Sequence, residues 1–176
     1  MKILFLDFDG VLNYQKYLIE KRPMIIEFCN INHNNINDIP VMFEKQMLYI
    51  NLDNLSNLIY IIRKTHAKVV VTSSWKTLEV FPLIMERLKS LGVPIIDVTY
   101  DDGMNRGEGI KNYLMQHEVK NYLILDDEIF PDYDDELIDH LVQPSFYEDG
   151  LNKMLAKEAV DRLNDKKVLV KKRKPY

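Results

Sequence analysis

The sequence predicts an α/β fold: a doubly wound, Rossmann-like parallel sheet with helices on both faces and a small insert after the first strand. Three observations lead to this prediction. Short apolar runs of strand length alternate with stretches of helical spacing, which is typical of parallel strands joined by helical crossovers. Polar residues follow several of these runs, as expected where strands end. The 176 residues, 47% of them hydrophobic, suit one domain with its own core, which we place at residues 1–165.

The first strand is predicted at residues 3–6, an uninterrupted apolar run. The run lacks a helical stripe and is too short for a membrane span, so it fits a strand buried on both faces. Asp7 and Asp9 follow it, and side chains at i and i+2 on extended backbone point the same way. Gly10 then allows a sharp turn. Taken alone, the four residues fit a plain turn and a cation site between two carboxylates equally well.

Residues 14–49 show no clean period and include a polar stretch at 30–38. We therefore expect an irregular insert here. Its apolar patches at 24–26 and 41–43 indicate that part of it packs against the domain as a small cap or flap.

The segment after the insert predicts a helix, a strand and a second helix. Apolar residues recur at helical spacing directly after position 51, where Asn51 or Asp53 can cap the helix. A β-branched run at 69–71 predicts a buried strand. The next helix is expected to follow Trp75 and to run through about Leu91, and Pro82 near its middle indicates a break or a new start.

The remaining elements continue the alternation of strands and helices. In order, they are a strand at 93–98, a helix at 107–117, a strand at 122–125, a loop with a short helix before 139, a strand at 140–143 and a helix at 151–163. In an open α/β sheet, ligands bind at the carboxyl edge of the strands, where Asp7 and Asp9 are expected to lie.

Besides the first strand, two further predicted strands are followed directly by polar groups, and a basic residue stands near a helix start. Thr72 and Ser73 follow the strand at 69–71. Arg106 stands near a helix start, and Asp126 and Asp127 follow the 122–125 run. Each signal is weak alone, since a hydroxyl or an acidic pair can be a helix cap and a lone arginine is usually a solvated charge.

Together, however, these motifs resemble the haloacid dehalogenase (HAD) superfamily. The resemblance is carried by residues 6–11, 69–75, 105–111 and 122–128, in the family's order. It covers the core from residue 1 to roughly 150. The residues Leu-Asp-Phe-Asp-Gly-Val-Leu-Asn, Ser-Ser-Trp and Leu-Asp-Asp further resemble HAD domains associated with RNA repair.

The resemblance implies a magnesium-dependent phosphomonoesterase that works through an aspartyl phosphate. It assigns Asp7 as the nucleophile, and Asp9 as the group that protonates the leaving oxygen and later activates water. It places Mg²⁺ on Asp7, on the Asp9 carbonyl and on Asp126, with Asp127 either as the ligand instead of Asp126 or as a supporting group. Oxygen ligands of this kind favour Mg²⁺ over zinc.

The same resemblance implies a set of phosphate-binding residues. These are Asp7, Asp9, Gly10, Thr72, Ser73, Arg106 and Lys111. Thr72 and Arg106 would also be catalytic, because they would hold phosphoryl oxygens as charge shifts in the transition state. The family's basic residue is usually a lysine; here Arg106 stands where the pattern expects it and Lys111 follows five residues later, and we favour Arg106.

The charge of the chain is uneven. The formal net charge is −4, yet residues 166–176 hold six lysines and arginines and no acid. Such a basic tail is either a phosphate-seeking arm for nucleic acid or a solvated terminus.

Cys29 is the only cysteine, and no signal peptide or membrane span is recognised, so we expect a cytoplasmic protein without a membrane partner. The oligomeric state is left open.

Trp75 directly follows the Thr-Ser-Ser hydroxyls. It could stack on a nucleobase, but a lone aromatic near a helix start more often packs in the core, and we favour that interpretation.

The motifs fix the chemistry and leave the substrate open. A nucleotide, a polynucleotide end or a protein phosphoryl group would suit a lightly covered site. Two other functions stay in competition: a non-catalytic HAD-fold module that binds an anionic partner, against which the intact Asp7 and Asp9 argue, and a phosphotransferase that passes the phosphoryl group to an acceptor other than water.

Overall fold

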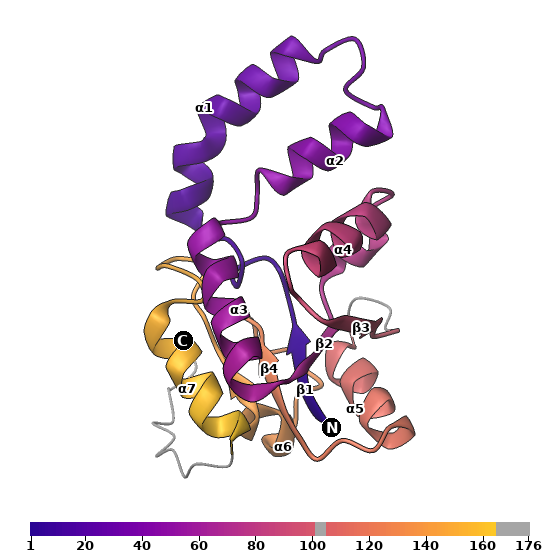
Figure 1. Ribbon diagram of the computed structural model, residues 1–176, viewed down its shortest axis with the longest axis vertical. Coiled ribbons are helices and arrows are strands. Elements are labelled where there is room, and N and C mark those ends of the chain that lie inside the picture. Colours follow the sequence, from indigo (N-terminus) through magenta and orange to yellow (C-terminus); the bar gives the residue numbers. More distant parts are fainter. Residues whose placement is uncertain (101–104, 165–176) are drawn as a thin grey trace.

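The computed structural model describes residues 1–100 and 105–164 and contains a five-stranded sheet (Figure 1). The strands are β1 (Lys2–Leu6), β2 (Lys68–Val71), β3 (Ile95–Val98), β4 (Asn121–Leu125) and β5 (Leu141–Val142). All neighbouring pairs are parallel, in the order β3-β2-β1-β4-β5. The predicted α/β fold with a parallel sheet is confirmed.

Helices cover both faces of this sheet. They are α1 (Gln15–Ile31), α2 (Ile39–Met47), α3 (Leu52–Thr65), the 3₁₀ helix η1 (Ser74–Thr77), α4 (Phe81–Ser90), α5 (Arg106–Gln116), α6 (Asp135–Asp139) and α7 (Lys153–Leu163). Helices α3, α4 and α7 pack on one face, and α5 and α6 on the other (Figure 1). Among these helices, none is long and apolar enough to cross a membrane.

Strand β1 lies at the centre of the sheet and belongs to both cores. Leu4 and Leu6 pack on the side of α3, α4 and α7, whereas Ile3 and Phe5 pack on the side of α5 and α6. None of the four side chains is exposed. The alternation follows from the two-residue period of a strand, and burial on both faces explains why the run is apolar throughout.

The expectation of an irregular insert at 14–49 is wrong, because α1 and α2 occupy most of it. The two helices extend beyond the carboxyl edge of the sheet (Figure 1). In α1 only Tyr17 is buried, so the helix has no wide apolar stripe for sequence periodicity to detect. Whether the pair acts as a cap stays a prediction.

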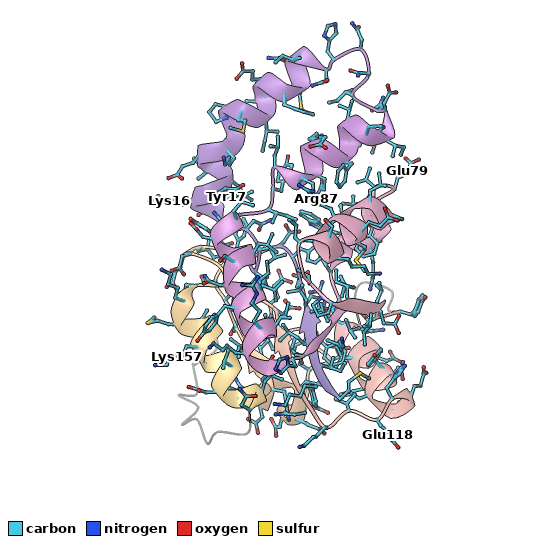
Figure 2. All side chains as sticks on the ribbon, viewed as in Figure 1. Lys16, Tyr17, Glu79, Arg87, Glu118 and Lys157 are labelled. Atoms are coloured by element: carbon cyan, nitrogen blue, oxygen red, sulfur yellow. The ribbon has the colours of Figure 1, made fainter. Side chains whose placement is uncertain are left out.

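Tyr17 ties the base of α1 to the chain that returns from α2 (Figure 2). Its hydroxyl lies 2.9 Å from the Leu48 carbonyl oxygen and 3.0 Å from that of Ile50. On the other side of this connection, Met42, Phe43 and other apolar residues of α2 pack against the core. The insert is therefore attached to the domain mainly through its base and through α2.

Two local predictions are confirmed at helix starts. Asn51, not Asp53, caps α3, and its side-chain oxygen accepts hydrogen bonds from the main-chain N–H groups of Asp53 and Asn54. Pro82 lies in the first turn of α4, where its missing N–H costs nothing, so the helix expected after Trp75 is interrupted between η1 and α4. The basic segment 166–176 lies outside the described residues.

Candidate active site at the carboxyl edge of the sheet

The residues predicted to follow strands meet at one edge of the sheet. Asp7 follows β1, Thr72 follows β2, and Asp126 and Asp127 follow β4. Main-chain hydrogen bonds hold the strand ends in register, from Asp7 N to the Leu125 oxygen and from Thr72 N to the Leu6 oxygen, each 2.9 Å. The parallel pairing of the central strands therefore brings together residues that lie far apart in the sequence.

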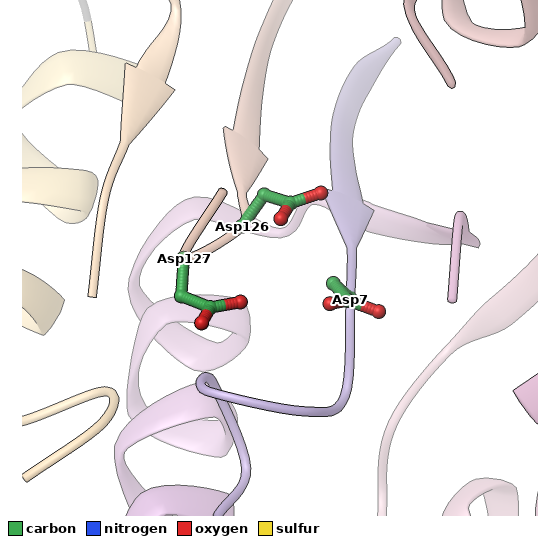
Figure 3. A group of neighbouring side chains, drawn as sticks. All are labelled: Asp7, Asp126 and Asp127. Atoms are coloured by element: carbon green, nitrogen blue, oxygen red, sulfur yellow. The ribbon is translucent and has the colours of Figure 1, made fainter. Parts of the chain in front are cut away.

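Three carboxylates form a cluster at this edge. Asp7, Asp126 and Asp127 each place one carboxylate oxygen within 4.8 Å of the others, and Figure 3 shows the three side chains around the space between the ends of β1 and β4. Asp126 is fully buried and Asp7 is 5% exposed. Like charges this close repel, so the ionised cluster needs a cation.

Burial is the largest influence on the protonation of these acids. It raises the pKa of Asp7, despite the opposing effect of Arg106. Burial and the charge of Asp7 raise the pKa of both Asp126 and Asp127 to about 7. Near neutral pH and without a metal, Asp126 and Asp127 are therefore partly protonated and partly ionised.

The cluster fits a divalent cation with oxygen ligands. The Asp7 Oδ1 atom is buried and has no hydrogen-bond partner among the described residues, which is unusual for a polar atom unless a ligand completes it. Three carboxylates supply the hard oxygen donors that Mg²⁺ prefers. The carboxylate of Asp9 does not belong to the cluster, so any share of Asp9 in the metal site would come through its carbonyl.

Arg106 joins the cluster from the first residue of α5. Its Nη1 atom lies 2.5 Å from Asp126 Oδ2 and 3.3 Å from Asp7 Oδ2, and its guanidinium stacks over Phe130, 4.3 Å from the ring centroid. Burial alone would lower the pKa of Arg106, but Asp7 and Asp126 raise it above its ordinary value. The arginine therefore stays charged inside the site.

Lys111 is not part of this arrangement. Its ammonium pairs with Asp134, 2.7 Å away, on the exposed side of α5. Of the two basic residues that the sequence offers, the structure brings Arg106 to the carboxylates and directs Lys111 to another acid.

The two hydroxyls after β2 differ in their surroundings. Thr72 is buried, and its Oγ1 atom has no hydrogen-bond partner within residues 1–100 and 105–164. Ser73 caps η1 by accepting a hydrogen bond from the Trp75 main-chain N–H, and its hydroxyl lowers the pKa of Asp7. Thr72 thus offers an unused donor to a ligand, whereas Ser73 supports the local backbone and the nucleophile candidate.

Asp9 is held by two residues that sequence reasoning did not connect to it. Its Oδ1 atom accepts a hydrogen bond from Asn13 Nδ2, and its Oδ2 atom accepts one from Trp75 Nε1, each 2.8 Å long. Trp75 is buried and packs edge to face against Phe8, as expected for a core residue. No spacing rule links positions 9 and 75; only the pairing of β1 with β2 brings them together.

Comparison with protein families agrees with this geometry. Residues 3–156 match the family described as the HAD domain in Swiss Army Knife RNA repair proteins. The chain belongs to this HAD family. The match includes every residue of the acidic cluster, Arg106 and both residues that hold Asp9. Neither curated proteins nor solved structures gave a match to the chain.

Membership makes this HAD domain a phosphatase-type or hydrolase-type enzyme. HAD domains typically use a divalent metal, and the buried aspartates supply a place for one. The family assignment and the convergence of carboxylates therefore point to the same edge of the sheet.

The stability of the HAD domain without magnesium should fall as pH rises, and the stabilisation by magnesium should grow with pH. The folded-state pKa of Asp126 and Asp127, about 7, exceeds the ordinary 3.8. Without metal, the contribution of these two carboxyl groups to the free energy of unfolding is therefore most favourable below pH 4. It is lost as pH rises to about 7. At a Mg²⁺ concentration about 100 times the Kd at pH 8, the Tm should rise by about 5–10 °C at pH 8. The same concentration should raise it far less at pH 5, where protonated aspartates bind the metal weakly. Thermal unfolding with Mg²⁺ or EDTA measures this, and an equal shift at both pH values would contradict it.

Gly10 of the HAD domain should not tolerate a side chain. Its φ is +67°, and a Cβ would overlap the Asp127 carboxylate. Gly10→Ala is expected to lower the free energy of unfolding by about 1–3 kcal/mol and to weaken magnesium binding, because Asp127 must move. Gly92→Ala is the matched control, since Gly92 also has a positive φ but a Cβ there would meet no atom of the described residues within 4 Å. Equal magnesium affinity in the two variants would refute the displacement of Asp127.

Proposed function

We propose that this HAD domain is a magnesium-dependent phosphomonoesterase that forms an aspartyl phosphate on Asp7. The observation that carries the proposal is the state of the Asp7 carboxylate. One oxygen faces Arg106, and the other is buried without a partner among the described residues. A carboxylate oriented by a cation, with one oxygen left unused, suits attack on a phosphorus atom.

In the first half-reaction, the Asp7 oxygen attacks the phosphorus and the bond to the leaving oxygen breaks. Asp9 gives its proton to that oxygen. In the second, Asp9 takes a proton from water, the water oxygen attacks the phosphorus, and the bond to Asp7 breaks, which releases phosphate. The exposed side chain of Asp9 is open to both leaving group and water.

Two buried donors support the binding of the phosphoryl group. The Thr72 hydroxyl and the Arg106 Nε lack hydrogen-bond partners among the described residues, so both can donate to phosphoryl oxygens. Asp7, Asp126 and Asp127 would hold Mg²⁺, which, when bound, offsets the repulsion between the nucleophile and a phosphate dianion.

A phosphorylated RNA end is the proposed substrate class, with a mononucleotide as the alternative. The matched family is described for RNA repair proteins, and Asp9 is exposed, so the end of a large molecule can reach it. The basic segment 166–176 supports nucleic acid as a partner. Its deletion should weaken oligonucleotide binding and reduce the salt dependence of that binding.

A substrate panel tests the proposal. Phosphate release would be measured from 3′- and 5′-phosphorylated oligoribonucleotides, nucleotides and sugar phosphates, with Mg²⁺ or EDTA. Release that needs Mg²⁺ and is lost in Asp7→Asn supports a phosphomonoesterase. Transfer to an added alcohol in place of water would indicate a phosphotransferase. Oligonucleotide binding without release from any substrate would indicate a binding module.

A further inference from the structure

We propose that Trp75 and Asn13 are positioning residues that hold the Asp9 carboxylate in place for proton transfer, an inference that rests on the proposed function. The two donors each engage a different oxygen, Asn13 Nδ2 at Oδ1 and Trp75 Nε1 at Oδ2, at 2.8 Å. An exposed aspartate without such contacts would sample several rotamers. The two hydrogen bonds restrict Asp9 to one.

Both donors are themselves fixed by the protein. Trp75 is 6% exposed, and its ring contacts Phe8 edge to face with centroids 5.2 Å apart. Asn13 is 1% exposed, and its Oδ1 atom accepts a hydrogen bond from the Gly10 main-chain N–H. That bond sets which way the amide faces, so its NH₂ group is directed at Asp9. The carboxylate is therefore attached to rigid parts of the fold and not to mobile side chains.

The chemistry of the donors suits a group that both gives and takes a proton. An indole N–H and an amide NH₂ donate but do not titrate in the range of an enzyme's activity, so neither competes with Asp9 for the proton. Each carboxylate oxygen accepts one of these bonds and keeps a further lone pair. Asp9 can thus give a proton to the leaving oxygen and take one from water while its position is maintained.

Burial of Trp75 also argues against a role in stacking on a nucleobase. A nucleobase stacks on the face of an aromatic ring, and such a face must be accessible. With 6% of the residue exposed, Trp75 offers little of its ring to a base. The polar edge is what reaches the site, through Nε1.

The single tryptophan of the chain permits a test that changes one group. Biosynthetic incorporation of benzothienylalanine in a tryptophan auxotroph replaces the indole N–H by sulfur and keeps the bicyclic shape. We expect kcat/KM for an alkyl phosphate, β-glycerophosphate, to fall by about 10-fold, because its leaving oxygen needs the acid. For p-nitrophenyl phosphate, whose leaving group needs little protonation, kcat/KM should change by less than about 3-fold, and KM should stay near that of the parent for both.

A double-mutant comparison separates positioning from a structural effect. Trp75→Phe keeps an aromatic ring against Phe8 and removes the N–H. When Trp75→Phe is introduced into the parent protein, kcat should fall by about 10-fold. In the Asp9→Asn protein the same change should lower kcat only slightly, because the carboxylate that Trp75 positions is already absent. Equal losses in both backgrounds would overturn the proposal. Tyr122→Phe is the control, since it removes a part-buried hydroxyl that contacts Glu136, away from Asp9.

The indole N–H proton gives a measurement that does not depend on turnover. The chain has one such proton, and its NMR resonance should move on Asp9→Asn because its acceptor changes. A resonance that does not respond would overturn the contact. If the parent hydrolyses no phosphate ester, the proposed function fails while this shift still reports on the contact. If the parent is active and the benzothienyl protein matches it on both substrates, the positioning role fails alone.

Discussion

Replacing Asp7 with asparagine is expected to abolish phosphate release while the fold is retained. The amide has nearly the shape of the carboxylate but cannot form the aspartyl phosphate, so turnover should fall by at least about 10⁴-fold. Stability should not fall with it. Burial raises the pKa of Asp7, which means that its ionised form is costly in the folded state, and the amide removes that charge. Without Mg²⁺, the free energy of unfolding should be unchanged or higher at pH 8.

Two measurements on the Asp7→Asn protein decide this prediction. Phosphate release from the best substrate of the panel gives the activity, and thermal unfolding with Mg²⁺ or EDTA gives the stability. The shift in Tm caused by Mg²⁺ should shrink, because one of three carboxylates in the cluster is gone. Asp53→Asn is a matched control on the exposed side of α3. A variant at position 7 that keeps more than about 1% of the activity would exclude Asp7 as the nucleophile.

The fold could be predicted for those elements whose burial gives a clear hydrophobic pattern in the sequence. The run at β1 is apolar because both of its faces are covered. Pro82 marks the start of α4, because a residue in the first turn of a helix has no intrahelical partner for the N–H that proline lacks. Helix α1 could not be predicted in the same way. Only Tyr17 in it is buried, so the helix has no wide apolar stripe and leaves little periodic signal in the sequence.

Part of the candidate site could likewise be predicted from the sequence, and part of it could not. Asp7, Thr72 and the Asp126-Asp127 pair could be predicted to meet because parallel strands end at a common edge. The neighbours of these groups depend on how side chains pack across the sheet. The contact from Trp75 to Asp9 and the stacking of Arg106 on Phe130 are of this kind. Strand order indicates which loops are adjacent, but it does not indicate which side chains in them touch.

The second large effect is expected at Arg106. Arg106→Ala removes the cation that lies 2.5 Å from Asp126 and 3.3 Å from Asp7, and leaves both acids buried without it. Activity should fall by about 10³-fold, since the variant loses a donor to the phosphoryl oxygens as well as the orientation of the nucleophile. The free energy of unfolding should fall by about 3 kcal/mol at pH 8. Arg106→Lys should recover part of the activity, because the charge is kept and only the planar fork is lost.

The pH dependence of the Arg106→Ala variant distinguishes lost charge from lost packing. Arg106 lowers the pKa of both Asp7 and Asp126, so its removal raises these values further above the ordinary 3.8. A folded-state pKa that lies further above the unfolded value makes the loss of stability between pH 5 and pH 8 larger, and denaturant unfolding in EDTA at the two pH values measures this difference. If the variant only lost packing against Phe130, it would be destabilised equally at both. Lys111→Ala is the control for Arg106→Ala, because Lys111 is paired with Asp134 outside the cluster. Its activity should match that of the parent within about 3-fold. If Lys111→Ala instead lost more activity than Arg106→Ala, Lys111 and not Arg106 would be the phosphate ligand.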